Sequence, residues 1–215
     1  MDAYQKFFDD FHIGKEDFLQ WGIDNTFFPE ISAVRKMWDD LKKRILENGE
    51  VFIRGYGRDA HGTDMYCKFY AMALGNCHVR KDPTNNAVPQ KYIEILTGKK
   101  RNKDVFNYQV SHIFGHTKNI FLFEAPWNIS LTPKVMDPFT GHEAKGDWVE
   151  EYQQKFQQAA ILRYREFIEE YNLLMDKCGI QQKLDTYISS LDAYDIKEIK
   201  RFESDARNEL QKLVI

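Results

Sequence analysis

Residues 108–143 concentrate side chains that could carry out chemistry. This 36-residue stretch holds three of the six histidines of the chain, His112, His116 and His142, together with the carboxylate of Asp137. The ordinary pKa of histidine lies close to neutral pH, so an imidazole can take a proton from water or ligate a transition metal. A carboxylate is a preferred ligand of hard cations such as Mg²⁺. The stretch therefore combines the groups that a metal-assisted hydrolysis would use.

The hydrophobic pattern predicts the strands that would position these groups. Two apolar runs, at residues 108–114 and 120–123, flank a polar turn, and this pattern is typical of a β-hairpin with a loose loop. A third apolar run, at residues 128–133, predicts a return strand. In this arrangement His112 lies at the end of a strand, and Asn128 lies in the return strand or in the turn before it.

A short helix is expected over residues 133–136, because this segment begins with proline, which is tolerated at the first helical position. Asp137 and Pro138 should end this helix. A turn at Gly141 then presents His142 just beyond it. The strands and the helix could thus wrap a single metal ion.

This arrangement resembles the HNH, or ββα-metal, nuclease superfamily over residues 105–146. In that family a histidine ends the first strand, an asparagine lies before or on the second, and a third histidine or asparagine lies on or after the helix. The matching residues here are His112, Asn128 and His142. An acidic metal ligand often precedes the first histidine in the family, and Ser111 takes that position here.

The resemblance implies a metal-dependent endonuclease that hydrolyses DNA. His112 would be the general base, and the amide of Asn128 would hold the loop that aims it. The divalent cation is expected to be Mg²⁺, with Mn²⁺ as the alternative. His142, Asp137 or both would ligate it, because the interval from Asn128 to His142 is longer than in compact family members. Ser111 completes the set of candidate metal ligands.

Residues 80–103 carry a local excess of positive charge, with seven Lys and Arg residues against two acidic ones. Neutralisation of phosphates dominates nucleic-acid affinity, so this segment is predicted to dock the substrate. A solvated basic loop is the alternative interpretation. Asparagine amides could also read base edges. The residues expected to contact nucleic acid are Lys99, Lys100, Arg101, Lys103, Lys118, His116, Asn85 and Asn86.

A second loop with basic residues follows a short predicted strand at residues 51–57. It contains Arg54, Arg58 and His61, with glycines that permit close approach of a ligand to the backbone. The loop could bind a phosphate, or it could be an ordinary connection from a strand to a helix. It has no match to the GxxxxGK[ST] phosphate-binding motif, so nucleotide binding is not indicated.

The composition of the whole chain limits these interpretations. With 215 residues, 43% of them hydrophobic and 14% aromatic, the chain is expected to form one ordered domain, or one domain with a helical appendage. Its formal net charge of −3 requires any nucleic-acid surface to be local. Three dispersed cysteines and the lack of a secretory signal or a long apolar span predict a cytoplasmic protein that does not cross a membrane.

Apolar residues at helical spacing flank the central region on both sides. We therefore expect an α+β, mainly helical fold with a helical segment at residues 1–50, an α/β core at 51–146 that contains the ββα-metal-like motif, and a helical segment at 147–215. The C-terminal apolar stripe could pack against the N-terminal helices or against a second copy. A homodimer is expected, because one site per chain would cut only one strand of a duplex.

Two other functions are consistent with the same residues. The chain could be a non-catalytic helical binding or regulatory protein whose histidines are structural, or it could be a toxin nuclease that uses the same site on RNA. A stand-alone restriction-type or defence enzyme acting on DNA is the reading that the resemblance favours.

Overall fold

A computed structural model of the chain describes residues 2–57, 62–141, 144–192 and 194–215. The helices are α1 (Ala3–Asp10), α2 (Lys15–Asp24), α3 (Ile31–Leu46), α4 (Thr63–Leu74), α5 (Ala87–Thr97), η2 (Lys134–Met136), α6 (Asp137–Thr140), α7 (Asp147–Lys177), α8 (Ile180–Ser189) and α9 (Ile196–Glu209). The strands are β1 (Val51–Ile53), β2 (Val79–Lys81), β3 (Tyr108–His112) and β4 (Ile129–Pro133). This confirms the predicted α+β, mainly helical class.

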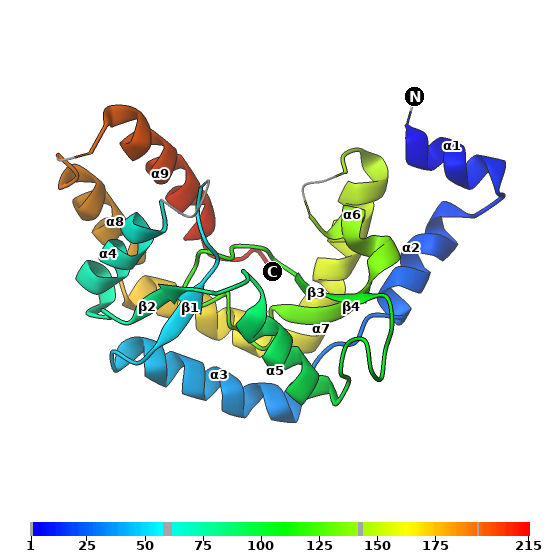
Figure 1. The fold of residues 1–215 in the computed structure, drawn as a ribbon, viewed down its shortest axis with the longest axis horizontal. Coiled ribbons are helices and arrows are strands. Elements are labelled where there is room, and N and C mark those ends of the chain that lie inside the picture. The colour runs from blue at the N-terminus through cyan, green and yellow to red at the C-terminus, as the bar shows by residue number, and fades with distance from the viewer. Residues whose placement is uncertain (1, 58–61, 142–143, 193) are drawn as a thin grey trace.

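The elements form a base from which two arms rise (Figure 1). The base contains α3, the second half of α7 and the two small sheets. One arm consists of α4, α8 and α9, and the other consists of α1, α2, α6 and the first half of α7. Among the described residues, no helix has the length and apolar character that crossing a bilayer requires.

Two separate two-stranded sheets lie in the base. β1 and β2 pair in parallel, with Val51 opposite Val79. β3 and β4 pair antiparallel, with Tyr108 opposite Pro133 and His112 opposite Ile129. The strands predicted from the apolar runs at residues 108–114 and 128–133 are therefore present as β3 and β4. His112 is the last residue of β3.

Residues 120–123 do not form the predicted strand. They lie in turns of a buried loop between β3 and β4. Their backbone donors find partners other than a neighbouring strand. The N–H of Ile120 donates to the Tyr70 hydroxyl at 3.0 Å, that of Phe121 donates to Oδ1 of Asn119 at 2.9 Å, and the next two donate to the backbone oxygen of Asn119. The hairpin consequently pairs β3 with β4 directly, across a long and densely packed loop.

The segment after β4 begins as predicted and then departs from the prediction. The short helix expected over residues 133–136 is the 3-10 helix η2. Asp137 and Pro138 do not stop the chain from coiling, because they form the first turn of α6. Proline fits there, since the first helical turn does not need its missing N–H donor. This places Asp137 at the start of α6, beside β3.

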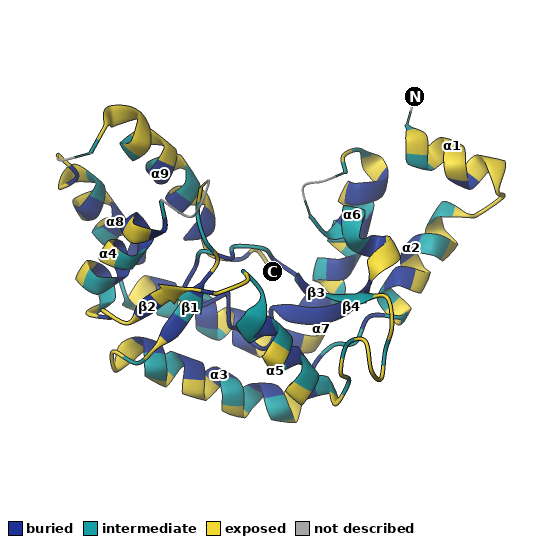
Figure 2. Ribbon diagram, in the orientation of Figure 1, coloured by how far each residue is buried: buried dark blue, intermediate teal, exposed yellow. Residues whose placement is uncertain are grey.

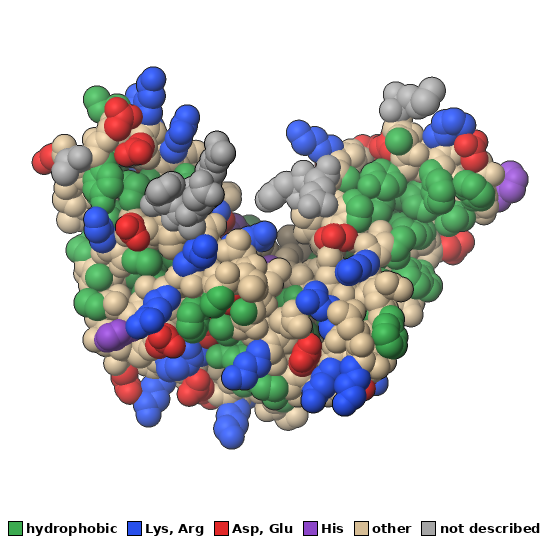
Figure 3. Space-filling model, in the orientation of Figure 1, with side chains coloured by type: hydrophobic (Ala, Val, Ile, Leu, Met, Phe, Trp, Pro, Cys, Tyr) green, Lys and Arg blue, Asp and Glu red, His purple; other side chains and the backbone are tan. Residues whose placement is uncertain are grey.

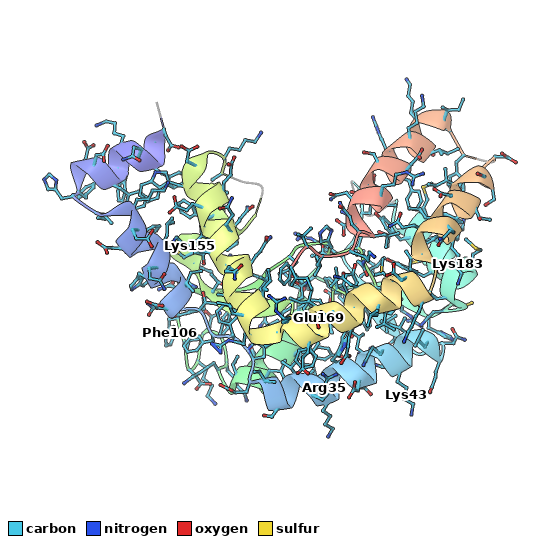
Figure 4. All side chains as sticks on the ribbon, turned by 180° about the vertical axis from the view of Figure 1, so that it is seen from behind. Arg35, Lys43, Phe106, Lys155, Glu169 and Lys183 are labelled. Atoms are coloured by element: carbon cyan, nitrogen blue, oxygen red, sulfur yellow. The ribbon has the colours of Figure 1, made fainter. Side chains whose placement is uncertain are left out.

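The long helix α7 bends at Tyr164, whose φ of −124° and ψ of 19° leave the helical region. The buried Tyr164 hydroxyl donates a hydrogen bond of 2.5 Å to the backbone oxygen of Pro29, so the bend packs against the segment that leads into α3. Figure 4 shows the two limbs, one carrying Lys155 and the other carrying Glu169 alongside α3.

Contacts between α3 and the second limb of α7 centre on Glu170. Its carboxylate accepts hydrogen bonds from Arg35 at 2.5 Å, Trp38 at 2.9 Å and Lys42 at 2.9 Å. The Arg35 guanidinium also lies 4.2 Å from the ring centroid of Phe167. Figure 4 shows Arg35 pointing from α3 toward α7. One carboxylate therefore links three side chains of α3 to α7.

The main hydrophobic core includes residues from the N-terminal, central and C-terminal parts of the chain. Figure 2 shows the buried faces of the helices turned inward. The predicted C-terminal stripe belongs to this core, with Tyr152, Phe156, Phe167 and Tyr171 almost completely buried. Because the stripe packs within its own chain, it is not the surface that would join two copies. The homodimer remains a prediction without an assigned interface.

Candidate functional site

A pocket of about 530 Å³ lies between the two arms, above the base. Its walls come from the loop after β1, the residue before α5, strand β3 with the loop that follows it, α6, and the last residue of α9. Figure 3 shows the surface hollowed between the arms, with Lys and Arg side chains around the hollow. The pocket thus combines segments that are distant in the sequence.

His112 lines this pocket at the end of β3. Its Nε2 lies 3.0 Å from the backbone oxygen of Phe123. A carbonyl oxygen can only accept a hydrogen bond, so Nε2 carries the ring proton and Nδ1 carries the lone pair. Burial lowers the pKa of His112 to about 4, and the positive charge of Arg54 contributes in the same direction. The imidazole is therefore neutral at neutral pH, which is the protonation state that a general base requires.

Asn128 ties together the loop that follows His112. This fully buried side chain accepts a hydrogen bond of 2.9 Å from the N–H of Phe114 through Oδ1. Its Nδ2 donates to the backbone oxygens of Gly115 at 3.3 Å and Leu122 at 3.0 Å. These contacts are the ones that the predicted loop-holding role needs. The amide lies behind the pocket wall and acts on His112 only through the backbone.

Two of the three predicted metal ligands, Ser111 and Asp137, line the pocket. The third, His142, lies outside the described residues. Gln109 Nε2 donates a hydrogen bond to Oδ1 of Asp137, which orients the carboxylate against β3. Ser111 is 6% exposed, and its hydroxyl has no hydrogen-bond partner within the described part of the chain. The sequence did not identify Gln109, because a single glutamine on a strand carries no signal of its own.

The donor set suits one kind of cation. Within the part of the chain that the structure describes, no group of three or more His, Cys, Asp and Glu side chains is placed to hold a metal ion. Zn²⁺ generally takes three or four protein ligands, whereas Mg²⁺ keeps several waters and often binds through one or two carboxylates and a substrate phosphate. A single carboxylate and a hydroxyl in one pocket are therefore too few ligands for Zn²⁺ and are nearer to what Mg²⁺ or Mn²⁺ takes from a protein.

Three side chains of the pocket carry buried polar atoms that have no hydrogen-bond partner among the residues that the structure describes. These atoms are Oδ1 of Asn86, Oγ of Ser111 and Nδ1 of His116. Buried polar groups in proteins are nearly always paired, so three such atoms around one pocket indicate that a polar ligand or water completes them. Asn85 has a different role, because its Oδ1 accepts a hydrogen bond of 2.9 Å from the N–H of Gly55 and thereby connects two pocket loops.

Lys118 also lines the pocket, but two carboxylates of α9 hold its ammonium group. Nζ lies 2.9 Å from Oε1 of Glu209 and 3.2 Å from Oδ1 of Asp205. The backbone N–H of Lys118 donates to Oε2 of Glu209 at 2.8 Å. These ion pairs offset much of the charge that was predicted to contact nucleic acid. Glu209 was missed by the sequence analysis, because nothing in the pattern of the C-terminal helix connects it with a loop 91 residues earlier.

The basic turn at residues 99–103, part of the predicted basic segment, lies away from the pocket. Its four side chains occupy the turn between α5 and β3, and none of them lines the pocket. β3 leads from this turn to His112, so the segment lies beyond one end of the strand and the candidate base lies at the other (Figure 1). Nη2 of Arg101 donates to Oε1 of Gln90 at 2.6 Å. The residues concerned are Lys99, Lys100, Arg101 and Lys103.

The loop after β1 contributes an arginine instead. Arg54 lines the pocket with an exposed side chain, and its backbone N–H donates to the oxygen of Thr117 at 2.9 Å. Its charge acts on the imidazole of His112, so the guanidinium and the candidate base share one electrostatic environment. Arg58 and His61 of the same loop lie outside the described residues. Both interpretations of this loop, a phosphate contact and an ordinary connection from a strand to a helix, stay predictions.

The fold and the pocket define an α+β, mainly helical protein in which a β-hairpin and a short helix present a histidine, a hydroxyl and a carboxylate to one cavity. The chain belongs to the family described as Uncharacterised protein PM1201, which matches residues 29–215. The Uncharacterized protein PM1201 of Pasteurella multocida (strain Pm70) is 40% identical over 178 residues, which cover 82% of this chain and 80% of that protein. No solved structure matches the chain significantly. The matched range includes every residue that lines the pocket.

Proposed function

We propose that this protein is a metal-dependent endonuclease that hydrolyses DNA phosphodiester bonds at a site of the HNH, or ββα-metal, type. The observation that carries the proposal is the neutral His112 imidazole, whose tautomer is fixed at the end of β3 in a pocket that also contains Asp137. A restriction-type or defence enzyme that acts as a homodimer is the proposed context.

In this proposal His112 is the general base. Its Nδ1 lone pair accepts a proton from the water molecule that attacks the phosphorus atom. The hydrogen bond from Nε2 to Phe123 keeps the ring in the orientation and tautomer that this transfer needs. A phosphate group beside the ring adds negative charge, which raises the pKa of the imidazole and makes it a stronger base.

Asp137, Ser111 and His142 are the proposed ligands of the Mg²⁺ or Mn²⁺ ion. The bound ion would supply stabilisation of the charge that develops on the phosphate and on the leaving oxygen. Gln109 orients the Asp137 carboxylate, and the hydroxyl of Ser111 offers an oxygen that no other group of the protein uses.

Arg54 is the proposed contact to the scissile phosphate. Its guanidinium lies in the pocket near the base, and planar guanidinium groups bind phosphate oxygens in pairs. Asn128 has a positioning role, because it holds the backbone that follows His112.

The proposal is tested by incubating purified protein with plasmid DNA in the presence of Mg²⁺, Mn²⁺ or EDTA. We expect nicked or linear DNA only with a divalent ion. His112→Ala should lower the cleavage rate by about 10²–10⁴-fold, because it removes the general base. His78→Ala is the matched control, since His78 is exposed and lies outside the pocket.

Two outcomes would count against the proposal. Cleavage by His112→Ala at the wild-type rate excludes His112 as the base. Cutting of single-stranded RNA without cutting of DNA in the same assay reverses the choice of substrate and favours the toxin-type nuclease.

A further inference from the structure

One side of α9 adjoins the pocket and carries four exposed polar side chains. We call this surface the α9 face, and its members are Lys200, Arg201, Ser204 and Asn208. They repeat at helical spacing, so they project from the same side of the helix. All four line a second cavity of about 570 Å³. This cavity is shallow and largely open to solvent, and Tyr56 lines both it and the pocket, so the α9 face and the pocket meet at one tyrosine.

The α9 face is fixed relative to the pocket by direct contacts. The Tyr56 hydroxyl donates to the backbone oxygen of Arg201 at 3.1 Å, which joins α9 to the loop after β1. The Lys118 ammonium lies 5.3 Å from the centre of the Tyr56 ring. These contacts hold the α9 face next to the loop after β1, which carries Arg54 into the pocket.

The charge of this surface is positive. Asp205 also lines the second cavity, but its carboxylate binds Nζ of Lys118 at 3.2 Å and the hydroxyl of Tyr66 at 2.5 Å. Within the described part of the chain, Lys200 and Arg201 form no ion pair with a carboxylate. Arg54 adds a third cation on the pocket side of Tyr56.

The types of side chain point to a specific ligand. Lys, Arg, Ser and Asn side chains make most of the contacts that proteins form with phosphate oxygens of a nucleic-acid backbone. The turn at residues 99–103 is also positively charged, but it lines neither the pocket nor the second cavity. Within it, the Lys99 ammonium lies over the Phe27 ring, 5.8 Å from its centroid.

We propose that the α9 face is the docking surface for the phosphate backbone of DNA and that it leads the strand past Tyr56 to the pocket. This inference rests on the proposed nuclease function for its substrate, and it assigns the docking role to α9 in place of the basic turn between α5 and β3.

The test measures binding separately from cleavage. A short fluorescein-labelled DNA duplex is titrated with protein in EDTA, and its anisotropy is followed at several KCl concentrations between about 50 and 200 mM. We compare wild type with the double variant Lys200→Ala, Arg201→Ala and with the matched control Lys99→Ala, Lys100→Ala, which removes the same charge. Lys100, Lys200 and Arg201 are exposed, and Lys99 is half-buried. None of the four belongs to the core, so both variants are expected to fold.

Each phosphate contact that is lost should reduce the slope of log affinity against log salt by about 0.9, so the α9 variant should lose about 2 units of slope and bind more weakly. The control should keep the wild-type slope. An unchanged slope in the α9 variant, a loss confined to the control, or no binding by the wild type would overturn the inference.

The outcome for docking is independent of the outcome for catalysis. Wild-type protein that binds DNA through the α9 face but never cuts it with Mg²⁺ or Mn²⁺ leaves the docking surface intact and refutes the nuclease. Protein that cuts DNA while the α9 variant binds normally refutes only the docking surface.

Discussion

Nε2 of His112 donates a hydrogen bond of 3.0 Å to the backbone oxygen of Phe123, and the two rings stack with their centroids 5.3 Å apart. Phe123 belongs to the buried loop between β3 and β4, so the core of the protein determines which ring nitrogen bears the proton. The same burial keeps this histidine neutral. A base in this state does not have to lose a proton before it acts, and the loop that provides the carbonyl is itself held by Asn128.

The low pKa of His112 predicts how the stability of the fold depends on pH. The pKa falls from 6.5 to about 4 on folding, so between these values the unfolded chain binds a proton that the folded chain does not. Lowering the pH through this window should therefore destabilise the protein, by about 3 kcal/mol at most, since one pKa unit corresponds to about 1.4 kcal/mol. Urea unfolding at a series of pH values measures the effect.

His112→Gln provides the comparison, because glutamine can still donate to the Phe123 oxygen but does not titrate. Its free energy of unfolding should fall less steeply between pH 6.5 and pH 4 than that of the wild type. His78→Gln, at an exposed position, should behave like the wild type. Identical pH dependence in His112→Gln and wild type would show that His112 is not the residue responsible.

Asn128→Ala should destabilise the protein strongly. The substitution leaves the N–H of Phe114 and the backbone oxygen of Gly115 without their partner in a buried loop, and the Leu122 oxygen keeps its bond from the N–H of Ala125. Each unpaired buried group costs about 1–3 kcal/mol, so we expect a loss of about 3 kcal/mol or more in urea unfolding. Asn25→Ala removes one hydrogen bond to the Trp21 oxygen at an exposed helix end and should cost much less. Equal losses in the two variants would contradict this account.

The helices and the β3–β4 pair could be predicted from sequence because their apolar residues repeat at the period of the element. Val34, Trp38, Leu41 and Ile45 follow helical spacing, and all four are fully buried in α3. Residues 120–123 could not be assigned in this way, because four consecutive apolar residues have no period. Their backbone N–H groups donate to Asn119 and to the hydroxyl of the distant Tyr70, and a local hydrophobic pattern does not reveal such contacts.

The candidate site was predictable only where its residues are close in sequence. Ser111, His112 and Asp137 lie within one motif, and the structure brings all three to one pocket. Arg54 lies far before this motif in the sequence, and Glu209 lies far after it. Their presence in the pocket depends on how two segments, α9 and the loop that follows β1, pack around β3. The excess charge at residues 99–103 indicated a basic surface but not where that surface lies.

Arg54→Ala should reduce DNA cleavage by roughly 10²-fold, since removal of a group that stabilises transition-state charge typically has an effect of this size. The loss should appear in kcat more than in KM if the guanidinium contacts the scissile phosphate in the transition state. Arg80→Ala is the matched control, because Arg80 is exposed on the neighbouring strand β2, opposite Phe52, and pairs with Glu50. Similar rates for both variants would remove Arg54 from the site.

Glu170→Ala should weaken the base of the molecule without touching the pocket. It leaves the fully buried Trp38 indole N–H without its acceptor and removes one carboxylate partner each from Arg35 and Lys42, which keep ion pairs with Glu166 and Asp39. We expect the free energy of unfolding, measured with urea, to fall by about 2 kcal/mol. Three fully buried charged contacts would be worth more, but this carboxylate is partly exposed and therefore screened by solvent.

Glu169→Ala is the control for this prediction, since Glu169 is exposed on the same limb of α7 and makes a long contact of 4.0 Å with Arg165. Its free energy of unfolding should stay within about 0.5 kcal/mol of the wild type. If Glu170→Ala were no more destabilising than Glu169→Ala, the link between α3 and α7 would rest on apolar packing alone. The midpoint of urea unfolding, measured for each variant at neutral pH, decides between these outcomes. The comparison requires that the free energy of unfolding falls with urea concentration at the same slope in both variants.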